Sequence, residues 1–356
     1  MAAELTTRVL GEADYPRWAA LVDESPEGGV YARPDYIEAL CKATGANLRV
    51  VIAERDNKIL GGITLYERSS RFGPYVHPRR LLYYNGLVLM PHPSSYPSQR
   101  TSSNLQVLAA IERALVQARY TRLRIKNRAA LSDVRVFVEN GWSVEPTYSY
   151  VVDISDLAAA WSRVDKNLRR LVTRCQEQGL VADISDDFDA FFRLHEETHV
   201  RKGAPLYLPR AAFRDFFADL RAKGLCRLYH ARAADGRVAA SQLVLASRHP
   251  VTHTVAAGTD EAFLNLGASA FLRWKVFEHL AGDGYKANDL TDAALNPVTH
   301  FKSQLGGELQ LNLELSRPDH VLMRLAARIT ATAARASRVA RRVLRRAGNE
   351  ETHDGN

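Results

Sequence analysis

The sequence predicts an α/β protein made of two similar halves, each a mixed, mostly antiparallel twisted sheet with helices on both faces. Two observations support this fold class. Pairs of β-rich runs that can form hairpins alternate with helices and single strands, which is typical of a mixed sheet covered by helices. The same order of elements occurs twice along the 356 residues. The distance in sequence between the two copies is far above the roughly 20 to 50 residues of stacked repeats, which indicates a duplicated domain.

The first half begins with two helices and a hairpin. A helical pattern surrounds residues 15–22, and a second helix is expected at 34–44 because Pro34 suits a first turn. β-rich runs at 48–54 and 59–66 flank a polar turn, which is typical of a hairpin. After a loop rich in Pro, Ser and Tyr, we expect a helix at 104–119, a strand at 121–127, a helix at 132–140 and a strand ending near Asp153.

The second half repeats this order. An amphipathic helix is expected at 187–199, where Phe188, Phe191 and Phe192 recur at helical spacing. The following elements are expected as a helix at 209–223, a hairpin of 227–233 with 238–246, a strand at 252–257, a helix at 267–281, a strand at 287–291, a helix at 297–305 and a strand at 308–315. We therefore predict domains at 1–152 and 153–318, followed by a C-terminal segment at 319–356.

The formal charge of +8 is concentrated in the C-terminal segment. Residues 321–349 contain eight Arg and no acid, so that residues 1–320 together carry only +3. Apolar residues recur every three to four positions beside the arginines, which predicts a basic amphipathic helix at about 321–346. Such helices lie on anionic membranes or contact phosphate backbones, and the alternative is a solvated helix without a partner.

Several functional classes are not expected. The sequence has no apolar run long enough to cross a bilayer and no leader-like N-terminus, so we expect a cytoplasmic protein, with peripheral membrane contact through 321–346 as one option. We expect Cys41, Cys175 and Cys226 to be buried thiols. We expect no two histidines to share a helix face as metal ligands do, and therefore predict no metal site.

Several motifs carry a family resemblance. They are Trp161 with Lys166-Asn167-Leu168-Arg169-Arg170, Thr198 with Arg201-Lys202-Gly203, Gly258-Thr259-Asp260, Leu272-Arg273-Trp274, Asn288-Asp289-Leu290 and Phe301-Lys302-Ser303-Gln304-Leu305-Gly306-Gly307. With the order of elements, these motifs resemble the Fem-like and BioF2-like acyltransferases of the N-acetyltransferase (GNAT) superfamily. The resemblance covers most of the second half, whereas the first half matches mainly in its elements.

The resemblance implies an enzyme that moves an acyl or aminoacyl group to an amine of a cell-envelope precursor, belonging to peptidoglycan or a polysaccharide. It implies no tightly bound cofactor, an acyl donor as co-substrate (aminoacyl-tRNA, acyl-coenzyme A or acyl-carrier protein), and a small-molecule or lipid-linked amine as acceptor. tRNA is thus one expected partner. The alternative is a catalytically degenerate binding module that docks at the membrane through the C-terminal helix.

One loop departs from the superfamily pattern. A coenzyme A-dependent member normally has a glycine-rich loop whose backbone amides hold the pyrophosphate at a helix N-terminus. The matching segment, 260–268, has two acids and Gly267 as its one glycine. This makes tight coenzyme A binding in the usual way less expected, and leaves Gly267 as the candidate binding position in the loop.

Four residues are candidate catalytic groups. The resemblance places Lys302 where it meets the acyl carbonyl or a donor phosphate. Asp289 and Asp292 end a strand, where α/β sheets gather functional groups, and either can orient an ammonium or accept its proton. Tyr207 is a candidate proton donor. The structural alternative for Lys302 is a solvated helix lysine, and for Asp292 it is a carboxylate that caps a turn before Pro297.

Basic residues are candidate substrate-binding groups. Arg201 and Lys202 end a helix, where they either grip a phosphate or simply favour the helix dipole. Arg169 and Arg170 belong to a basic helix between the two halves that suits an acidic substrate or is a solvated face. Four cations alternate along one strand: Arg122, Arg124, Lys126 and Arg128. They are expected to project from one solvated face, unless an anion binds to them.

Overall fold

The protein is described by a computed structural model for residues 4–295 and 297–317, in which thirteen strands form one sheet. The order across the sheet is β1-β2-β3-β4-β6-β13-β7-β12-β11-β10-β9-β8, with β5 paired to β3. Neighbouring strands are antiparallel except for β4 with β6 and β11 with β12. The α/β fold class predicted from the sequence is confirmed, whereas the predicted helix at 321–346 lies outside the described residues.

The strands follow the predicted order with additions at the sheet edges and in the long loop. They are β1 (Thr6–Val9), β2 (Asn47–Arg55), β3 (Lys58–Ser70), β4 (Gly73–Val76), β5 (Leu87–Leu89), β6 (Arg122–Lys126), β7 (Ser143–Asp153), β8 (Val181–Ser185), β9 (Cys226–Arg232), β10 (Val238–Leu245), β11 (Val251–Thr259), β12 (Ala287–Asp292) and β13 (Glu308–Arg317).

The helices lie near the predicted positions, except that α3 begins at Pro97 rather than at 104, and a short helix, α5, is added before the basic one. They are α1 (Tyr15–Glu24), α2 (Pro34–Thr44), α3 (Pro97–Gln117), α4 (Arg135–Glu139), α5 (Leu157–Arg163), α6 (Lys166–Glu177), α7 (Phe188–Arg201), α8 (Arg210–Ala222), α9 (Ala268–Gly282) and α10 (Pro297–Ser303).

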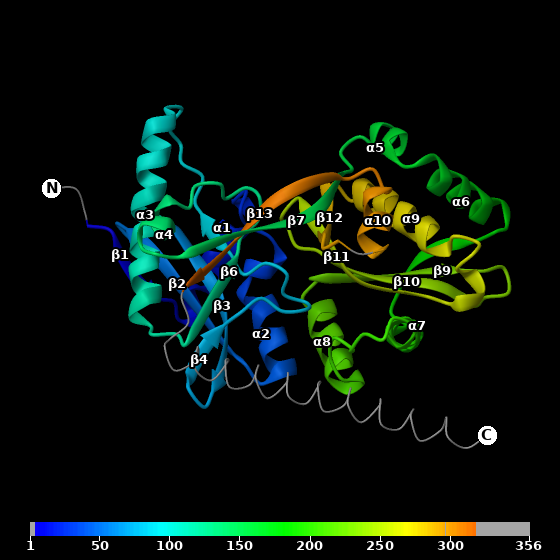
Figure 1. Cartoon of the computed structure of the whole chain (residues 1–356), viewed down its shortest axis with the longest axis horizontal. Helices are drawn as coiled ribbons and strands as arrows, with labels where there is room; N and C mark the ends of the chain where they lie inside the picture. The colour runs from blue at the N-terminus through cyan, green and yellow to red at the C-terminus, as the bar shows by residue number, and fades with distance from the viewer. Residues whose placement is uncertain (1–3, 296, 318–356) are drawn as a thin grey trace, which may run out of the picture.

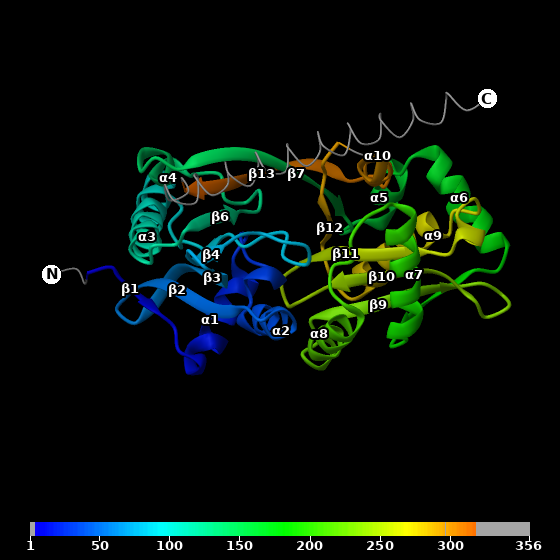
Figure 2. The ribbon, with the colours of Figure 1, turned by 60° about the horizontal axis from the view of Figure 1, so that its bottom comes forward.

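Helices cover both faces of the sheet in each half (Figures 1 and 2). In the first half, α3 and α4 pack on one face, and α1 and α2 lie on the other. In the second half, α6 and α9 pack on one face, and α7 and α8 lie on the other. The three cysteines are buried free thiols, as expected.

The last strands of the two halves are exchanged across the centre of the sheet. β13, from the end of the second half, pairs with β6 and β7 of the first half. β7, the last strand of the first half, also pairs with β12 of the second half. The two strands therefore form a ribbon that joins the halves (Figure 1).

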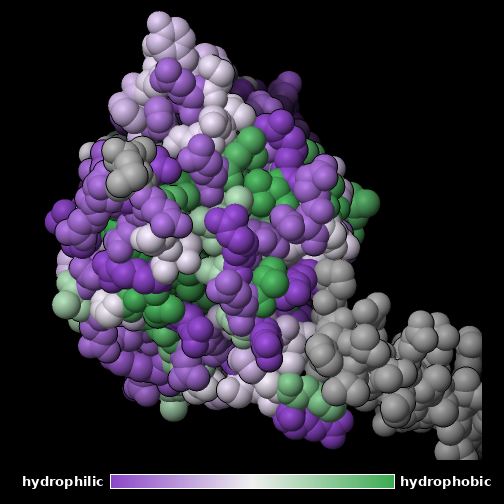
Figure 3. Space-filling model, turned by 90° about the vertical axis from the view of Figure 1, so that its left-hand side faces the viewer, coloured by the Kyte–Doolittle hydropathy of each residue, from purple (hydrophilic) through white to green (hydrophobic). Residues whose placement is uncertain are grey.

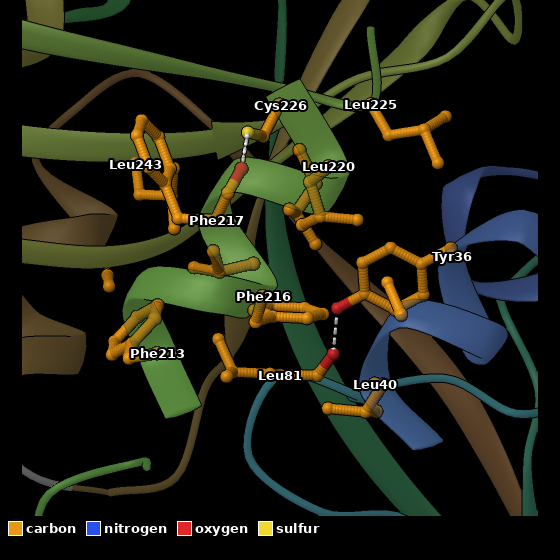
Figure 4. Packing of buried hydrophobic residues seen from close by; sticks show 14 of the residues in the cluster. Tyr36, Leu40, Leu81, Phe213, Phe216, Phe217, Leu220, Leu225, Cys226 and Leu243 are labelled. Atoms are coloured by element: carbon orange, nitrogen blue, oxygen red, sulfur yellow. Dashed lines mark hydrogen bonds between the residues drawn. The ribbon is translucent and has the colours of Figure 1, made fainter. Parts of the chain in front are cut away.

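A hydrophobic cluster also spans the two halves below this ribbon. α2 of the first half lies beside α8 of the second half in both ribbon views (Figures 1 and 2). Tyr36 points from α2 toward Phe216 of α8, and its hydroxyl donates a hydrogen bond to the carbonyl of Leu81 (Figure 4). The core is therefore continuous between the halves.

The distribution of apolar residues bears on whether the described part of the chain could span a membrane. On the end of the molecule shown in Figure 3, hydrophobic side chains lie in small groups between polar ones. Within residues 4–295 and 297–317, none of the helices combines the length and the apolar composition that crossing a bilayer requires.

Candidate functional site

The site is built where two parallel strands of the second half separate. β12 pairs with β11 only from Ala287 to Asp289, after which β11 continues along β10 to Thr259. The pairing of β12 with β7 is also irregular between Asp289 and Asp292. The C-terminal end of β12 is thus free to carry functional groups, as the ends of strands in α/β sheets commonly are.

Lys302 lies against this strand end. α10 brings its amine to the carbonyls of Thr291, at 3.0 Å, and Asp292, at 2.6 Å. Burial, together with the charge of Arg273, lowers the pKa of Lys302 to about 8. An amine with this pKa can donate hydrogen bonds as an ammonium at neutral pH and lose its proton with a modest rise in pH.

Thr291 has an unusual backbone conformation. Its φ is +55°, in the left-handed region that β-branched residues rarely adopt. The residue is buried, and its backbone N–H donates to Asp289 Oδ1 at 2.7 Å. This conformation lets its N–H meet Asp289 while its carbonyl accepts from Lys302.

Asp289 is the centre of a buried polar group formed by both halves. Its Oδ2 accepts a hydrogen bond from the Tyr84 hydroxyl at 2.8 Å and lies 3.6 Å from His253 Nδ1. Burial alone would raise the pKa of Asp289, but His253, Arg128 and Tyr84 hold it below its ordinary value. Asp289 is therefore an ionised carboxylate at neutral pH and a weak base.

Tyr207 lies near the exposed end of β12. Burial and the neighbouring hydroxyl of Tyr207 raise the pKa of Tyr83 well above its ordinary value, and the charge of Asp292 adds to this effect. Asp292 itself is exposed. The structure thus brings Lys302, Asp289 and Asp292 to one end of β12, and Tyr207 lies beside Tyr83 of the first half.

Arg201 and Lys202 end α7 near the C-terminal end of β11. The guanidinium of Arg201 donates to the carbonyl of Thr259 at 2.7 Å and to Thr198 Oγ1 at 3.1 Å. Lys202 is exposed at the surface. Arg201 thus contacts the C-terminal end of β11, and Lys202 follows it at the surface.

Several cations at this place have no acidic partner. Within the described residues, Lys126, Arg273 and Lys302 form no ion pair, and Nη1 of Arg273 is buried without any hydrogen bond. Burial lowers the pKa of Arg273 to about 10. Many surface cations of the protein are paired, for example Arg193 with Glu197, Arg227 with Asp283 and Arg232 with Asp183. A buried cation without an anion is costly, so this cluster suits an anionic or carbonyl-bearing ligand.

Arg169 and Arg170 lie apart from this cluster. They line an open groove of about 630 Å³ on α6, together with Trp161, Lys166, Thr173, Arg174 and Glu177. Four cations and one acid in one groove favour a polyanion. The groove adjoins the end of α10, because the backbone N–H of Asp165 bonds to the carbonyl of Gln304.

The predicted binding position at Gly267 is covered. Gly267 caps α9 with a φ of +94°, and a Cβ at this residue would lie 2.6 Å from Cβ of Leu171 on α6. The guanidinium of Arg174, also on α6, donates to the carbonyl of Leu266 at 2.9 Å. α6 therefore packs directly on this loop at Gly267 and bonds to its carbonyls.

One histidine pair contradicts the expectation that no two histidines share a helix face. His195 and His199 are four residues apart on α7, and their ring centroids are 4.2 Å apart. Burial lowers the pKa of His195 to about 3, and its ring stacks on Phe191. No cluster of three or more possible metal ligands occurs within residues 4–295 and 297–317. Aromatic packing accounts for the ring of His195.

The cations along β6 do not form the single solvated row that the sequence predicted. Arg124 pairs with Glu314 of the exchanged strand β13 at 3.3 Å. Lys126 is buried, and its amine lies 5.7 Å from the centroid of the Tyr84 ring. Arg128 follows β6 and contacts the carbonyl of Gly28. The strand runs into the junction of the halves, which buries its last cations.

Three further residues of the site were not among the predicted candidates. They are Tyr84, His253 and Arg273. Arg273 belongs to the motif Leu272-Arg273-Trp274, so its position was marked but its role was not. Nothing in the sequence pairs Tyr84 with Asp289, 205 positions away.

Comparison with known proteins finds one matching domain family. Residues 162–303 match the family described as acetyltransferase (GNAT) domain. The sequence matches none of the curated proteins with which it was compared.

Solved structures with the same fold cover nearly the whole chain. FemX superposes with a TM-score of 0.68 at 11% identity, over 86% of this chain and 96% of FemX. The C-terminal domain of a putative lysylphosphatidylglycerol synthetase from Agrobacterium fabrum gives 0.57 at 12% identity, over 90% and 95%. A tandem GNAT protein from the clavulanic acid biosynthesis pathway gives 0.51 at 14% identity, over 89% and 99%. Residues 162–303 therefore match an acetyltransferase (GNAT) domain, in a chain whose overall fold is shared with FemX and with a tandem GNAT protein.

Proposed function

We propose that the protein transfers an activated acyl or aminoacyl group to an amine, and that Lys302 stabilises the reacting carbonyl. The observation that carries this proposal is the position of Lys302, a partly buried amine with a lowered pKa, held at the open end of β12 by two backbone carbonyls. The match of residues 162–303 to an acyl-transferring domain supports it.

The reaction proceeds by direct attack. The neutral acceptor amine forms a bond to the acyl carbon, and the carbonyl oxygen becomes an oxyanion that accepts a hydrogen bond from the Lys302 ammonium. The tetrahedral intermediate then expels the carrier, with cleavage of the carrier's ester or thioester bond. Asp292, exposed at the strand end, takes the proton released by the amine, and Tyr207 gives a proton to the leaving group.

The acceptor that we propose is an amine of a cell-envelope precursor. The name of one structural neighbour, lysylphosphatidylglycerol synthetase, describes joining an amino acid to a lipid. The unpaired cations Arg273 and Lys126 favour substrates with a phosphate or carboxylate near the reacting centre. A precursor that carries a free amine and is linked to a lipid or a nucleotide through phosphate has both the acceptor group and the anion.

For the donor, we propose a carrier with several phosphates, of which aminoacyl-tRNA is the first candidate. The covering of Gly267 by Leu171 opposes the usual mode of coenzyme A binding. The groove around Arg169 and Arg170 adjoins α10 and suits a phosphate backbone. Acyl-coenzyme A and acyl-carrier protein are the competing donors.

An assay of acyl transfer from each candidate donor tests this proposal. The full chain is incubated with aminoacyl-tRNA, acyl-coenzyme A or acyl-carrier protein and a panel of phosphate-bearing amines, and amide formation is followed by mass spectrometry. We expect amide products from aminoacyl-tRNA and loss of tRNA binding on Arg169→Gln/Arg170→Gln. Products from acyl-coenzyme A alone would remove the tRNA donor, and no product from any donor would favour a non-catalytic binding module.

Residues 321–346 enter the proposal as a membrane contact. Their arginines and apolar positions fit an anionic membrane surface, where a lipid-linked acceptor would be found. Flotation with vesicles of anionic lipid measures this contact. We expect the full chain to float with the vesicles and a chain ending at Pro318 to remain behind; equal behaviour of both would contradict the contact.

A further inference from the structure

Three consecutive hydrogen bonds connect the first half of the protein to Lys302. The Tyr84 hydroxyl donates to Asp289 Oδ2 at 2.8 Å, and Asp289 Oδ1 accepts from the backbone N–H of Thr291 at 2.7 Å. The carbonyl of Thr291 then accepts from the amine of Lys302 at 3.0 Å. The chain of contacts starts in a loop of the first half and ends at the proposed catalytic amine.

The middle of this chain is under strain. A β-branched residue with a φ of +55° is disfavoured by roughly 1 to 2 kcal/mol, so Thr291 keeps this conformation only while other contacts hold it. The contact of its N–H with the Asp289 carboxylate is one such restraint, and a charge-assisted bond of this kind is strong. Without it, the peptide can relax and its carbonyl can turn away from Lys302.

Asp289 needs a partner that fixes its carboxylate. Its side chain is almost completely buried. Of the two side chains next to Oδ2, the Tyr84 hydroxyl is within hydrogen-bond distance at 2.8 Å, whereas His253 Nδ1 is 3.6 Å away. Tyr84 is itself packed against neighbours, with the ring of Tyr31 5.9 Å away and the amine of Lys126 5.7 Å away. The hydroxyl is therefore rigidly placed.

We propose that Tyr84 is a positioning residue, which holds Lys302 at the end of β12 through Asp289 and Thr291. This inference rests on the proposed role of Lys302 in acyl transfer. It gives the first half, which lies outside the matched GNAT domain, a direct part in the active site. It also assigns Asp289 to the support of Thr291 rather than to proton transfer, in keeping with its lowered pKa.

The test is the titration of Lys302 in the full chain, with no substrate present. Competitive labelling of lysine amines with acetic anhydride over a range of pH, read by mass spectrometry of the peptide, gives the pKa of Lys302. Tyr84→Phe removes the hydroxyl and keeps the ring. Because burial is the main cause of the lowered pKa, a released Lys302 becomes hydrated, and we expect its pKa to rise by about one unit or more from about 8.

Tyr66→Phe is the matched control. Tyr66 is a buried tyrosine of the first half whose hydroxyl donates to Thr44 Oγ1 at 2.8 Å, away from β12. We expect this variant to leave the titration of Lys302 unchanged. A pKa of Lys302 that is the same in Tyr84→Phe as in the wild type, or lower, would overturn the proposal.

Asp289→Asn serves as the second variant, and decides the matter if Tyr84→Phe fails to fold. Removal of a nearby negative charge alone would lower the pKa of Lys302, whereas release of the side chain into water raises it. A rise supports positioning, and a fall or no change shows that Asp289 acts only as a neighbouring charge and overturns the proposal. Because no donor or acceptor is needed, the result is independent of whether the proposed transfer occurs.

Discussion

At the level of single residues, Lys302 differs from the surface lysines in what surrounds its amine. Two backbone carbonyls hold it, and no carboxylate within the described residues pairs with it. Arg273 adds positive charge nearby and has a buried nitrogen without a partner. The pKa of the Lys302 amine therefore lies within the pH range in which enzymes work. An oxyanion-binding group with adjustable charge requires such a pKa.

This arrangement predicts the effect of Arg273→Gln on the pH dependence of transfer. Lys302 stabilises the oxyanion only while protonated, so activity should fall as pH rises through its pKa of about 8. Removing the charge of Arg273 removes a cause of the lowered pKa, and the alkaline limb should move to higher pH. The pH profile of kcat/KM measures this shift.

Arg214→Gln is the control for this variant. Arg214 lies on α8 and pairs with Asp189 at the surface, so its removal should leave the profile unchanged. An alkaline limb that stays in place, or moves to lower pH, in Arg273→Gln would show that Arg273 does not act on Lys302.

At the level of elements, α6 packs against the loop at Gly267, which corresponds in sequence to the usual pyrophosphate loop. Leu171 of α6 packs directly on Gly267 at the start of α9, and Arg174 bonds to the loop carbonyls. A positive φ and a close neighbour both require glycine here. The glycine thus serves helix packing in this structure, although the sequence alone made it a candidate for substrate binding.

Gly267→Ala should therefore destabilise the protein. The left-handed conformation and the contact with Leu171 together predict a loss of roughly 2 to 4 kcal/mol in the free energy of unfolding. Gly282→Ala, at the other end of α9, meets no atom within 4 Å and should change stability by less than about 1 kcal/mol. Urea denaturation of both variants measures the difference; equal stabilities would contradict the packing described.

The sequence predicted regular elements well where local signals begin and end them. The helix at 34–44 was predicted at its observed bounds because Pro34 begins it and Gly45, with a φ of +65°, ends it. β4 and β5 were missed because they are short strands inside a loop rich in Pro and Ser. β4 forms a tight hairpin with the end of β3 that the composition of this loop obscures, and β5 pairs with Gly61–Ile63 of β3, a more remote contact that no local pattern reveals.

The site was predictable only in part for the same reason. Lys302, Asp289 and Asp292 were found because they belong to recognisable motifs near a strand end. The hydrogen bond from Tyr84 and the backbone strain at Thr291 depend on how the halves meet, which the sequence of either half does not contain.

At the level of the whole molecule, the exchange of β7 and β13 makes the two halves interdependent. Leu315 of β13 is buried among side chains of the first half, and β12 pairs with β7. A second hydrophobic cluster joins α2 with α8 (Figure 4). The predicted division at 152/153 therefore follows the duplicated element order, while both the sheet and the core continue across it.

This continuity predicts that the halves unfold together. Residues 154–317 alone would lack β6 and β7, leaving β12 and β13 with unpaired edges, and we expect this fragment to be insoluble or unfolded. Calorimetry of the full chain should show one cooperative transition for residues 4–317. Two well-separated transitions, or a folded fragment 154–317, would contradict this interdependence.

The central claim, that Lys302 carries the transfer chemistry, is tested most directly by the single-turnover rate of Lys302→Ala with the best donor and acceptor found. We predict a decrease of about 100-fold or more, with an unchanged unfolding temperature, because an oxyanion donor is lost. Lys286→Ala, which removes an exposed lysine just before β12, should keep the wild-type rate. A Lys302→Ala protein that transfers at the wild-type rate would contradict the account.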